Sequence, residues 1–540
     1  MKRVIFKWLF LWVIWGCALR LMAFPTRSDN QSHVHSSCSK TRYPALCVRT
    51  LMSSNQNHAD HSMSTLVDKV ISETAELPSS ALFSARLEDS AADHPHHLSI
   101  DGAREYCSEA MNLSLRPLKQ SAQALKKFPD LDKQDIQTWL SAALTLQQGC
   151  LDEIISKSHS YQNRLIADKI SHKVNHLVQL SSIALALVNK ISTVKVTKTR
   201  AHQTSEATFP SWVSVGDRKF IRTNGQTDNI NAVVAQDGSG DHETIKEAIN
   251  AAPSGKRYVI YIKAGVYKEQ IKTNKDGITL IGEGKYSTII VASNGVEKDD
   301  CSLEDSATFT TTGDRFIAVG MSFQNSAGPR GGQAIALHVS SDHAIIYNCS
   351  IVSYQDSLYA KINRQFYKNC DIMGTIDFIF GEAAAVFQNC NLLLRKPEHK
   401  QYNVILASGR SHPEQNSGFS VLNCKIRGAA ELDEEGGSCK SYLGRPWKRY
   451  SRSVVINSEI GGVVAREGWQ MWPEADYSKT LYFGEYGNVG EGASTSGRVK
   501  WKGFHVIGEE EAEQFTVQNF IAGESWISAT GIPFSAGLKG

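Results

Sequence analysis

An Asn-Cys dipeptide recurs through the second half of this chain at intervals of about 20 residues. The pairs that form the repeat begin at Asn348, Asn369, Asn389 and Asn423. The first three lie 21 and 20 residues apart, and each follows an aromatic-rich run and precedes a short apolar one. A repeat of this length with β-rich units predicts a parallel β-helix, in which each turn stacks its residues on the equivalent residues of the next turn.

Two acids and two amides follow the same period. Asp356 and Asp377 are 21 residues apart, and Gln333 and Gln355 are 22 residues apart, so each pair is separated by about one turn. Because neighbouring strands lie about 4.8 Å apart, the repeat predicts that the four side chains gather on one face. Two carboxyls that close do not both ionise easily, so we expect one raised pKa and a division into acid and nucleophile. The alternative is a ladder of Asn and Asp side chains that only caps the turns.

The first 23 residues are typical of a secretory signal. A basic pair precedes a nearly continuous apolar run over Val4–Cys17. We expect a signal peptide at 1–23, and the alternative is an uncleaved anchor, which would be the only membrane contact of the chain. Ten of the eleven cysteines lie after this segment, and an even number fits disulfides in an exported protein.

Length and composition predict two globular domains and no role with nucleic acid. The chain has 540 residues, which is too long for one ordinary domain, and its 41% hydrophobic and 21% charged residues are usual for a globular protein. The net charge is only +3, and no basic patch interleaved with aromatic residues is present. Nucleic acid is therefore not an expected partner.

Residues 30–192 predict a bundle of helices. Apolar residues return at three- and four-residue steps from 136 to 151 and again from 166 to 188. The four cysteines of this half lack the spacing of metal ligands, so we expect structural disulfides and no metal site. Sequence spacing favours the pairs Cys38–Cys47 and Cys107–Cys150, although four cysteines allow three connectivities.

Residues 193–229 break the helical pattern and predict a linker. Arg218 and Lys219 form a dibasic site in this segment, where a processing protease would cut, although a solvated charge pair fits as well. In residues 230–540, short runs of Val, Ile, Thr, Tyr and Phe alternate with turns. This pattern predicts the strands of the β-helix.

Five short blocks carry the remaining signal, because the common enzyme motifs are missing. No Gly-x-Ser-x-Gly elbow and no His-Glu-x-x-His metal motif is present. The blocks, in chain order, are Gly265–Glu269, Gln333–Leu337, Gln355–Leu358, Asp377–Gly381 and Leu443–Trp447. Together and in this order, they resemble the signature blocks of the plant pectin methylesterases.

The helical half carries a resemblance of its own. The stretches Cys38–Cys47 and Asp135–Asp152 resemble the pectin methylesterase inhibitor domain. The whole resemblance covers about residue 30 to residue 540. It implies an N-terminal all-α four-helix bundle as a pro-region, which inhibits the enzyme half or assists its folding, and then a right-handed parallel β-helix that carries the enzyme. It also implies secretion to the cell wall, where the enzyme modifies pectin.

The resemblance assigns roles to the acids and amides. Asp377 is implied to attack the methyl-ester carbonyl of a galacturonate unit in pectin, as a carboxylic ester hydrolase. Asp356 would protonate the departing methanol and then activate water, while Gln333 and Gln355 would hold the oxyanion, at about 3–4 kcal/mol for each donor. Arg445 would pair with Asp377 and orient it. The residues implied to contact the substrate are Gln333, Tyr359, Phe380, Arg445, Trp447 and Trp469. No metal and no organic cofactor is required.

Two positions of the enzyme half depart from the family pattern. Ser357 stands where threonine is usual and keeps the hydroxyl, whereas Leu303 stands where a substrate-contacting threonine is common and removes one expected contact to a sugar hydroxyl. Two other functions stay open. Paired acids on a β-helix also suit a polysaccharide hydrolase or lyase, although the amide pair favours ester chemistry. The helical half could instead inhibit other methylesterases in trans.

Overall fold

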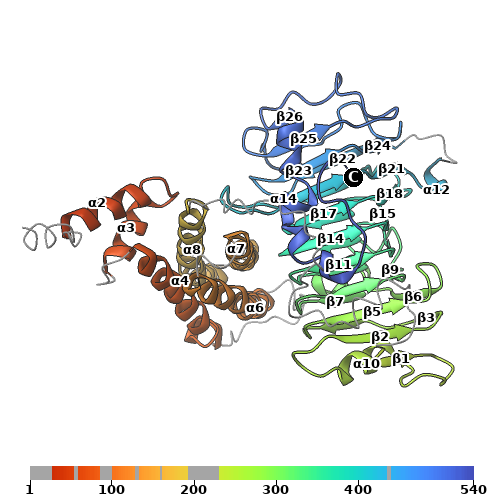
Figure 1. Ribbon diagram of the computed structural model, residues 1–540, viewed down its shortest axis with the longest axis horizontal. Coiled ribbons are helices and arrows are strands. Elements are labelled where there is room, and N and C mark those ends of the chain that lie inside the picture. Colours follow the sequence, from red (N-terminus) through yellow and green to blue (C-terminus); the bar gives the residue numbers. More distant parts are fainter. Residues whose placement is uncertain are drawn as a thin grey trace, which may run out of the picture.

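The computed structural model describes residues 27–53, 59–84, 100–127, 133–157, 161–191, 230–433 and 439–539. Within these ranges the chain forms a helical region and a stack of strands that lie side by side (Figure 1). The predicted signal segment and the dibasic site at Arg218 and Lys219 lie outside the described residues. In the described part of the chain, no helix is both long and apolar enough to span a bilayer.

The helical region is a bundle of four long helices with a short helical pair at its N-terminal end. The helices are α2 Arg27–Cys38, α3 Pro44–Ser53, α4 Ala59–Glu76, α5 Ala81–Ser84, α6 Ile100–Lys126, α7 Lys133–Ser156 and α8 Tyr161–Asn189. α6 packs against α4 and α7, and α8 packs against the same two helices, which closes the bundle. The predicted all-α bundle is therefore confirmed.

The predicted apolar stripes form the core of the bundle. Ile136, Leu140 and Leu144 of α7 and Val174 of α8 are fully buried. Both predicted disulfides are present, because Cys38 pairs with Cys47 and joins α2 to α3, while the Cys107–Cys150 bond joins α6 to α7. Such bonds stabilise the fold chiefly by restricting the unfolded chain.

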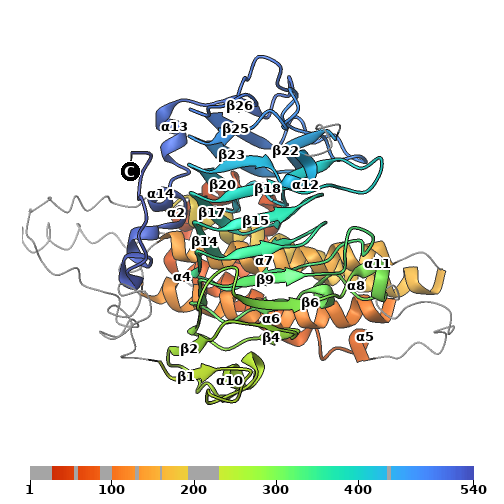
Figure 2. The ribbon, with the colours of Figure 1, turned by 90° about the vertical axis from the view of Figure 1, so that its right-hand side faces the viewer.

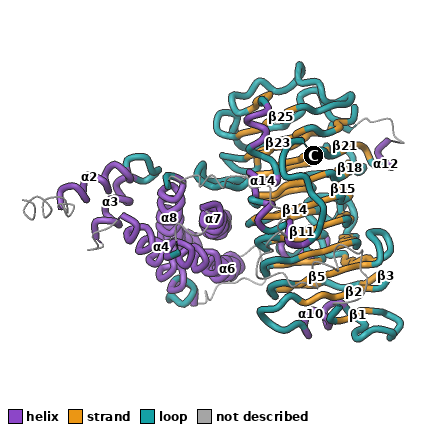
Figure 3. The backbone as a smooth tube through the Cα atoms, viewed as in Figure 1, coloured by secondary structure: helices purple, strands orange, loops and turns teal. Residues whose placement is uncertain are grey.

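The strands form the predicted parallel β-helix, with three sheets among the described residues (Figure 3). The eleven-stranded sheet contains β1 Ala232–Val234, β2 Tyr258–Ile262, β5 Ile278–Gly282, β8 Ile317–Val319, β11 Ala344–Tyr347, β14 Arg364–Lys368, β17 Ala384–Gln388, β20 Gly418–Leu422, β23 Arg452–Ile456, β25 Tyr482–Tyr486 and β26 Phe504–Val506. The eight-stranded sheet contains β3 Gly265–Tyr267, β6 Thr288–Ala292, β9 Ser322–Asn325, β12 Ser350–Val352, β15 Asp371–Gly374, β18 Asn391–Leu394, β21 Lys425–Gly428 and β24 Glu459–Ile460.

The seven-stranded sheet is the one that concerns function. It contains β4 Ile271–Thr273, β7 Phe309–Thr311, β10 Leu337–Val339, β13 Leu358–Ala360, β16 Ile379–Gly381, β19 Asn403–Ser408 and β22 Ser441–Pro446. Short helices decorate the coil at α10 Ile245–Ala251, α11 Val296–Asp299, α12 Ala430–Asp433, α13 Glu509–Glu513 and α14 Val517–Ile521. Each coil contributes one strand to each sheet through most of the stack, which explains the period of about 20 residues.

The Asn-Cys repeat marks one corner of the coil. The asparagines at 348, 369, 389 and 423 have φ between 51° and 56°, a left-handed conformation that asparagine adopts more readily than most residues. The cysteine after each of them is buried in the core and unpaired. The repeat therefore combines a turn residue outside with a small apolar side chain inside, once for each coil.

The bundle lies against one flank of the β-helix. α6 and α7 are the long helices nearest to the strands in Figure 1, and Figure 2 shows the bundle behind the sheets. Residues of α6 and α7 bond to loops that follow strands of the seven-stranded sheet, as in the contact between Thr145 and Glu382. The two regions therefore meet beside the sheet that carries the predicted acids.

Candidate active site

Two acids occupy equivalent positions on neighbouring coils of the seven-stranded sheet. Asp356 and Asp377 each stand two residues before a strand, β13 and β16, and both have left-handed backbone, with φ of 63° and 50°. The strands pair in parallel with Leu358 opposite Ile379. The prediction that the period brings the two acids together is therefore confirmed. Both residues are buried, with 3% and 5% of their surface exposed.

Arg445 binds one of the two acids through a fork. It lies on β22, two strands from β16 in the same sheet. Its Nε donates to Oδ1 of Asp377 at 2.8 Å, and its Nη2 donates to Oδ2 at 2.6 Å. Two hydrogen bonds from a cation in a buried place fix the direction of the carboxylate and favour its ionised form. The pairing that the resemblance implied is thus present.

The surroundings of the two carboxyls differ. Burial, followed by the charge of Asp377, raises the pKa of Asp356 well above its ordinary value. Burial also raises the pKa of Asp377, but the two bonds from Arg445 act against this. Among the described residues, the cation that binds the pair directly is Arg445, on Asp377, so the geometry favours the proton on Asp356 and the negative charge on Asp377. Within the described residues, no group of three or more His, Cys, Asp or Glu side chains is placed to hold a metal ion.

The two amides also stack across neighbouring coils. Gln333 and Gln355 form a parallel bridge, as their spacing predicted. Nε2 of Gln333 donates to Oδ2 of Asp356 at 2.8 Å, and Gln355 directly precedes Asp356 in the chain. Both amides are half-buried. The arrangement places amide donors beside a carboxyl pair, and their role toward an oxyanion stays a prediction.

The two departures from the family pattern have different consequences. Ser357 Oγ donates to the carbonyls of Tyr354 and Met373 at 3.2 and 2.8 Å, so this hydroxyl fastens the turn that carries Asp356. Leu303 packs against the apolar cluster beside the acids. It therefore presents a hydrocarbon side chain where a hydroxyl was expected.

Aromatic side chains line the sheet next to the acids. The rings of Tyr359 and Phe380 stack with centroids 4.3 Å apart, and Trp447 meets Phe380 edge-on at 6.1 Å. These three predicted substrate contacts form one apolar cluster, in which Trp447 is half-buried. A flat aromatic surface of this kind suits the apolar faces of sugar rings.

Trp469 is not part of this surface, and its prediction as a substrate contact is wrong. It is 1% exposed, its ring stacks on Phe483, and its Nε1 donates to Glu485 at 3.0 Å, so it fills the core. Trp472 faces the site in its place, with its ring centroid 4.4 Å from Cζ of Arg445. A sequence pattern with two nearby tryptophans does not show which one is buried.

The bundle docks where β13, β16 and β22 end, the strands that follow the two acids or carry Arg445. Nζ of Lys361, five residues after Asp356, lies between the rings of Tyr359 and Tyr106, the latter from α6, at 5.6 and 5.5 Å from their centroids. Thr145 Oγ1 of α7 donates to Glu382, five residues after Asp377, at 3.0 Å. The α7 carboxylate of Asp152 accepts from Nζ of Lys448 at 2.5 Å, next to Trp447.

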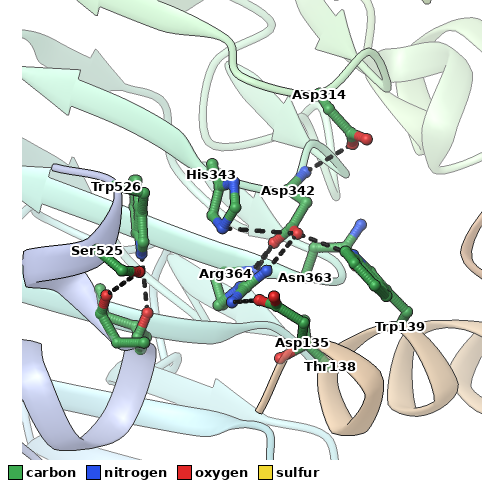
Figure 4. A network of polar contacts seen from close by, with 12 residues as sticks. Asp135, Thr138, Trp139, Asp314, Asp342, His343, Asn363, Arg364, Ser525 and Trp526 are labelled. Carbon is green, nitrogen blue, oxygen red and sulfur yellow. Dashed lines mark hydrogen bonds and ion pairs between the residues drawn. The ribbon is translucent and has the colours of Figure 1, made fainter. Parts of the chain in front are cut away.

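A second group of contacts anchors the bundle to the eleven-stranded sheet, at Arg364 of β14 (Figure 4). Arg364 is 1% exposed and binds two carboxylates, Asp342 on the β-helix through Nε and Nη2 and Asp135 on the bundle through Nη1. Trp139 Nε1 donates to Asp342 at 3.0 Å. A buried arginine shared between two regions makes this contact sensitive to the loss of either carboxylate.

Comparison with known proteins assigns each half of the chain to a protein family. Residues 231–524 match the pectinesterase family, and residues 32–187 match the plant invertase/pectin methylesterase inhibitor family. Pectinesterase 1 of Citrus sinensis is 38% identical over 534 residues, covering 94% of this chain and 90% of that protein. Probable pectinesterase/pectinesterase inhibitor 54 of Arabidopsis thaliana is 41% identical over 508 residues, covering 92% and 91%.

Among solved structures, a pectin methylesterase from carrot is 48% identical with a TM-score of 0.57. The match covers 99% of the carrot chain and 58% of this one, and this 58% corresponds in length to the β-helix. The site, the fold and the sequence matches agree. This chain belongs to the pectinesterase family, and it carries a domain of the pectin methylesterase inhibitor type ahead of its β-helix.

Proposed function

We propose that this protein hydrolyses the methyl esters of galacturonate units in pectin through a covalent intermediate on Asp377. Asp377 is the nucleophile, because it is ionised and aimed by Arg445. Its carboxylate attacks the ester carbonyl carbon, and the amides of Gln333 and Gln355 donate to the oxygen that becomes negative. Asp356 gives its proton to the methoxy oxygen as that C–O bond breaks, so methanol leaves and an anhydride remains.

Hydrolysis of the anhydride restores the enzyme. Asp356, now a carboxylate, takes a proton from water, and the resulting hydroxide attacks the galacturonyl carbonyl of the anhydride. The bond from this carbon to the Asp377 oxygen breaks, so Asp377 leaves as a carboxylate, Asp356 has regained its proton, and the galacturonic acid product gives its own proton to the solvent. The observation that supports this cycle most strongly is the unequal environment of the two acids, since only one of them is bound by Arg445.

Removing one amide donor tests the ester chemistry. We expect Gln355→Ala to lower kcat for methanol release by about 10²–10³, with little change in KM, because the donor acts mainly on the charge formed in the transition state. The matched control is Gln236→Ala, which removes an exposed amide that bonds only to the backbone of Val266 in the described structure. An unchanged kcat in Gln355→Ala would exclude an oxyanion role for this residue.

We further propose that the bundle keeps the enzyme silent. Each of the strands β13, β16 and β22 is followed by a residue that contacts α6 or α7. These residues are Lys361, Glu382 and Lys448. Tyr359 and Phe380 are 7% and 4% exposed, and Tyr359 approaches Tyr106 of α6 through the ammonium group of Lys361. A pectin chain that reaches the acids would therefore meet the bundle on one side. Assistance with folding of the enzyme half is a second role that the same contacts support.

We also propose a route to the active form. The chain divides into a signal at 1–23, a bundle at 30–192, a linker at 193–229 and a catalytic β-helix at 230–540. A processing protease cuts at Arg218 and Lys219, and the enzyme works outside the cell in the wall. The signal-like N-terminus, the two disulfides of the bundle and the pectinesterase relatives support this proposal.

A further inference from the structure

The guanidinium of Arg445 is held by more than its fork to Asp377. Its third nitrogen, Nη1, donates to the hydroxyl of Tyr402 at 3.0 Å. The ring of Trp472 covers the face of the same group, with Cζ 4.4 Å from the ring centroid. The Tyr402 hydroxyl restrains movement of the guanidinium within its plane, and the Trp472 ring restrains movement perpendicular to that plane.

The position of Tyr402 follows from the fold. It directly precedes β19, the strand that lies between β16 and β22. Asp377 precedes β16 and Arg445 lies on β22. In the order of strands, Tyr402 therefore lies between Asp377 and Arg445. Its own ring is supported edge-on by Tyr442, with centroids 6.1 Å apart at 86°.

The third bond matters because the direction of the nucleophile depends on Arg445. The fork of two bonds fixes the carboxylate relative to the guanidinium but does not itself fix the guanidinium, and a nucleophile that moves with its partner spends less time in line with the ester carbon. A neutral hydroxyl that accepts from a cation gives a stronger bond than one between two neutral groups. Tyr402 therefore restricts the movement of Arg445 without binding Asp377 itself.

We propose that Tyr402 is a positioning residue for the reaction, acting through Arg445 to hold Asp377 in its attacking direction. This inference rests on the proposed role of Asp377 as the nucleophile. Neither the five sequence blocks nor their spacing indicates it, because Tyr402 lies outside every block. The function is geometric, since the described contacts of the hydroxyl are with Arg445.

The test removes only the hydroxyl. The full chain is purified as Tyr402→Phe, its linker is cut with a protease at an engineered site, and methanol release is measured against pH. We expect kcat to fall about fivefold, the loss of one hydrogen bond, with KM nearly unchanged. We also expect the acid limb of the kcat profile to move to higher pH, because Arg445 opposes protonation of Asp377 less well when it is held less firmly.

Two comparisons separate positioning from a general structural effect. Tyr442→Phe removes the hydroxyl of the supporting ring and is expected to change neither kcat nor the acid limb. In an Arg445→Ala background, Tyr402→Phe is expected to cause no further loss of kcat. The effects of two substitutions are not additive when one residue acts through the other. A purely structural role of Tyr402 would instead lower kcat by the same factor in the wild-type and Arg445→Ala backgrounds.

The outcomes also distinguish this inference from the proposed function. Wild-type enzyme that releases methanol beside a Tyr402→Phe variant with unchanged kcat and acid limb would overturn the positioning role alone. A loss that is equal in the wild-type and Arg445→Ala backgrounds would overturn it as well. Absence of methanol release from the folded wild-type enzyme would overturn both proposals together.

Discussion

Replacing Asp377 by Asn is expected to abolish methanol release. The amide has nearly the shape of the carboxylate but is not a nucleophile at neutral pH, so the covalent step is lost and kcat falls by about 10⁴ or more. The change also removes the charge that pairs with Arg445, which is 9% exposed at its side chain. Asp356→Asn is expected to give a loss of similar order, because Asp356 donates a proton in the first step and accepts one in the second.

Asp371→Asn is the matched control for these variants. Asp371 is also a buried acid of the β-helix, but it lies on β15 in a different sheet and binds Lys285 at 2.6 Å and Asn391 at 2.6 Å. Its loss is expected to lower stability and leave kcat nearly unchanged. Activity in Asp377→Asn comparable with that of this control would rule out Asp377 as the nucleophile.

Separating the bundle from the β-helix is expected to raise the rate on polymeric pectin by at least about tenfold. Two regions joined in one chain meet at an effective concentration on the order of millimolar, so even a modest affinity keeps the intact chain docked. Cutting the linker and diluting the protein removes that advantage. Methanol release for each enzyme molecule should then rise on dilution of the cut chain and stay constant on dilution of the intact chain.

The docked state is also expected to weaken as pH rises. Burial is the largest cause that raises the pKa of Glu382 to about 7, against the charge of Lys448 and the hydrogen bond from Thr145 of α7. Glu382 is thus neutral in the docked state at low pH, and docking is at full strength below the ordinary pKa of a carboxyl. That stability is lost as pH rises through about 7, because Glu382 must then carry a buried charge or separate from the bundle.

A single substitution isolates this pH effect. Glu382→Gln imitates the protonated acid and keeps an acceptor for Thr145, so docking should persist to higher pH than in the wild type. The pH at which half of the bundle has separated from the β-helix should shift upward, as measured from the methanol rates of the cut and diluted chain. An intact chain as active as the cut and diluted one at every pH would contradict the inhibitory role of the bundle.

Much of the candidate site could be predicted because the fold is a repeat. A period of about 20 residues fixes which residues become neighbours across coils, so Asp356 and Asp377, and likewise Gln333 and Gln355, could be paired before any coordinates were known. The spacing of the bundle cysteines favoured the pairing that the structure shows, although it left three connectivities open. These features depend on residues of regular period or on near neighbours in the chain.

Features set by side-chain direction or by contact between the two regions could not be predicted in this way. Trp469 and Trp472 differ only in which one the local turn directs into the core. Tyr402, which precedes β19, meets Arg445 on the neighbouring strand β22, 43 residues away in sequence. The shared arginine Arg364 joins regions separated by 229 residues, and no period links them.

The most direct test of the reaction measures methanol and newly formed reducing ends in one sample of methylated pectin treated with the cut, diluted enzyme. We expect methanol to appear in step with new galacturonate carboxylates, while the number of reducing ends stays at its starting value. Shortening of the polysaccharide chain without methanol would contradict ester hydrolysis and would instead assign the paired acids to cleavage of the glycosidic bond.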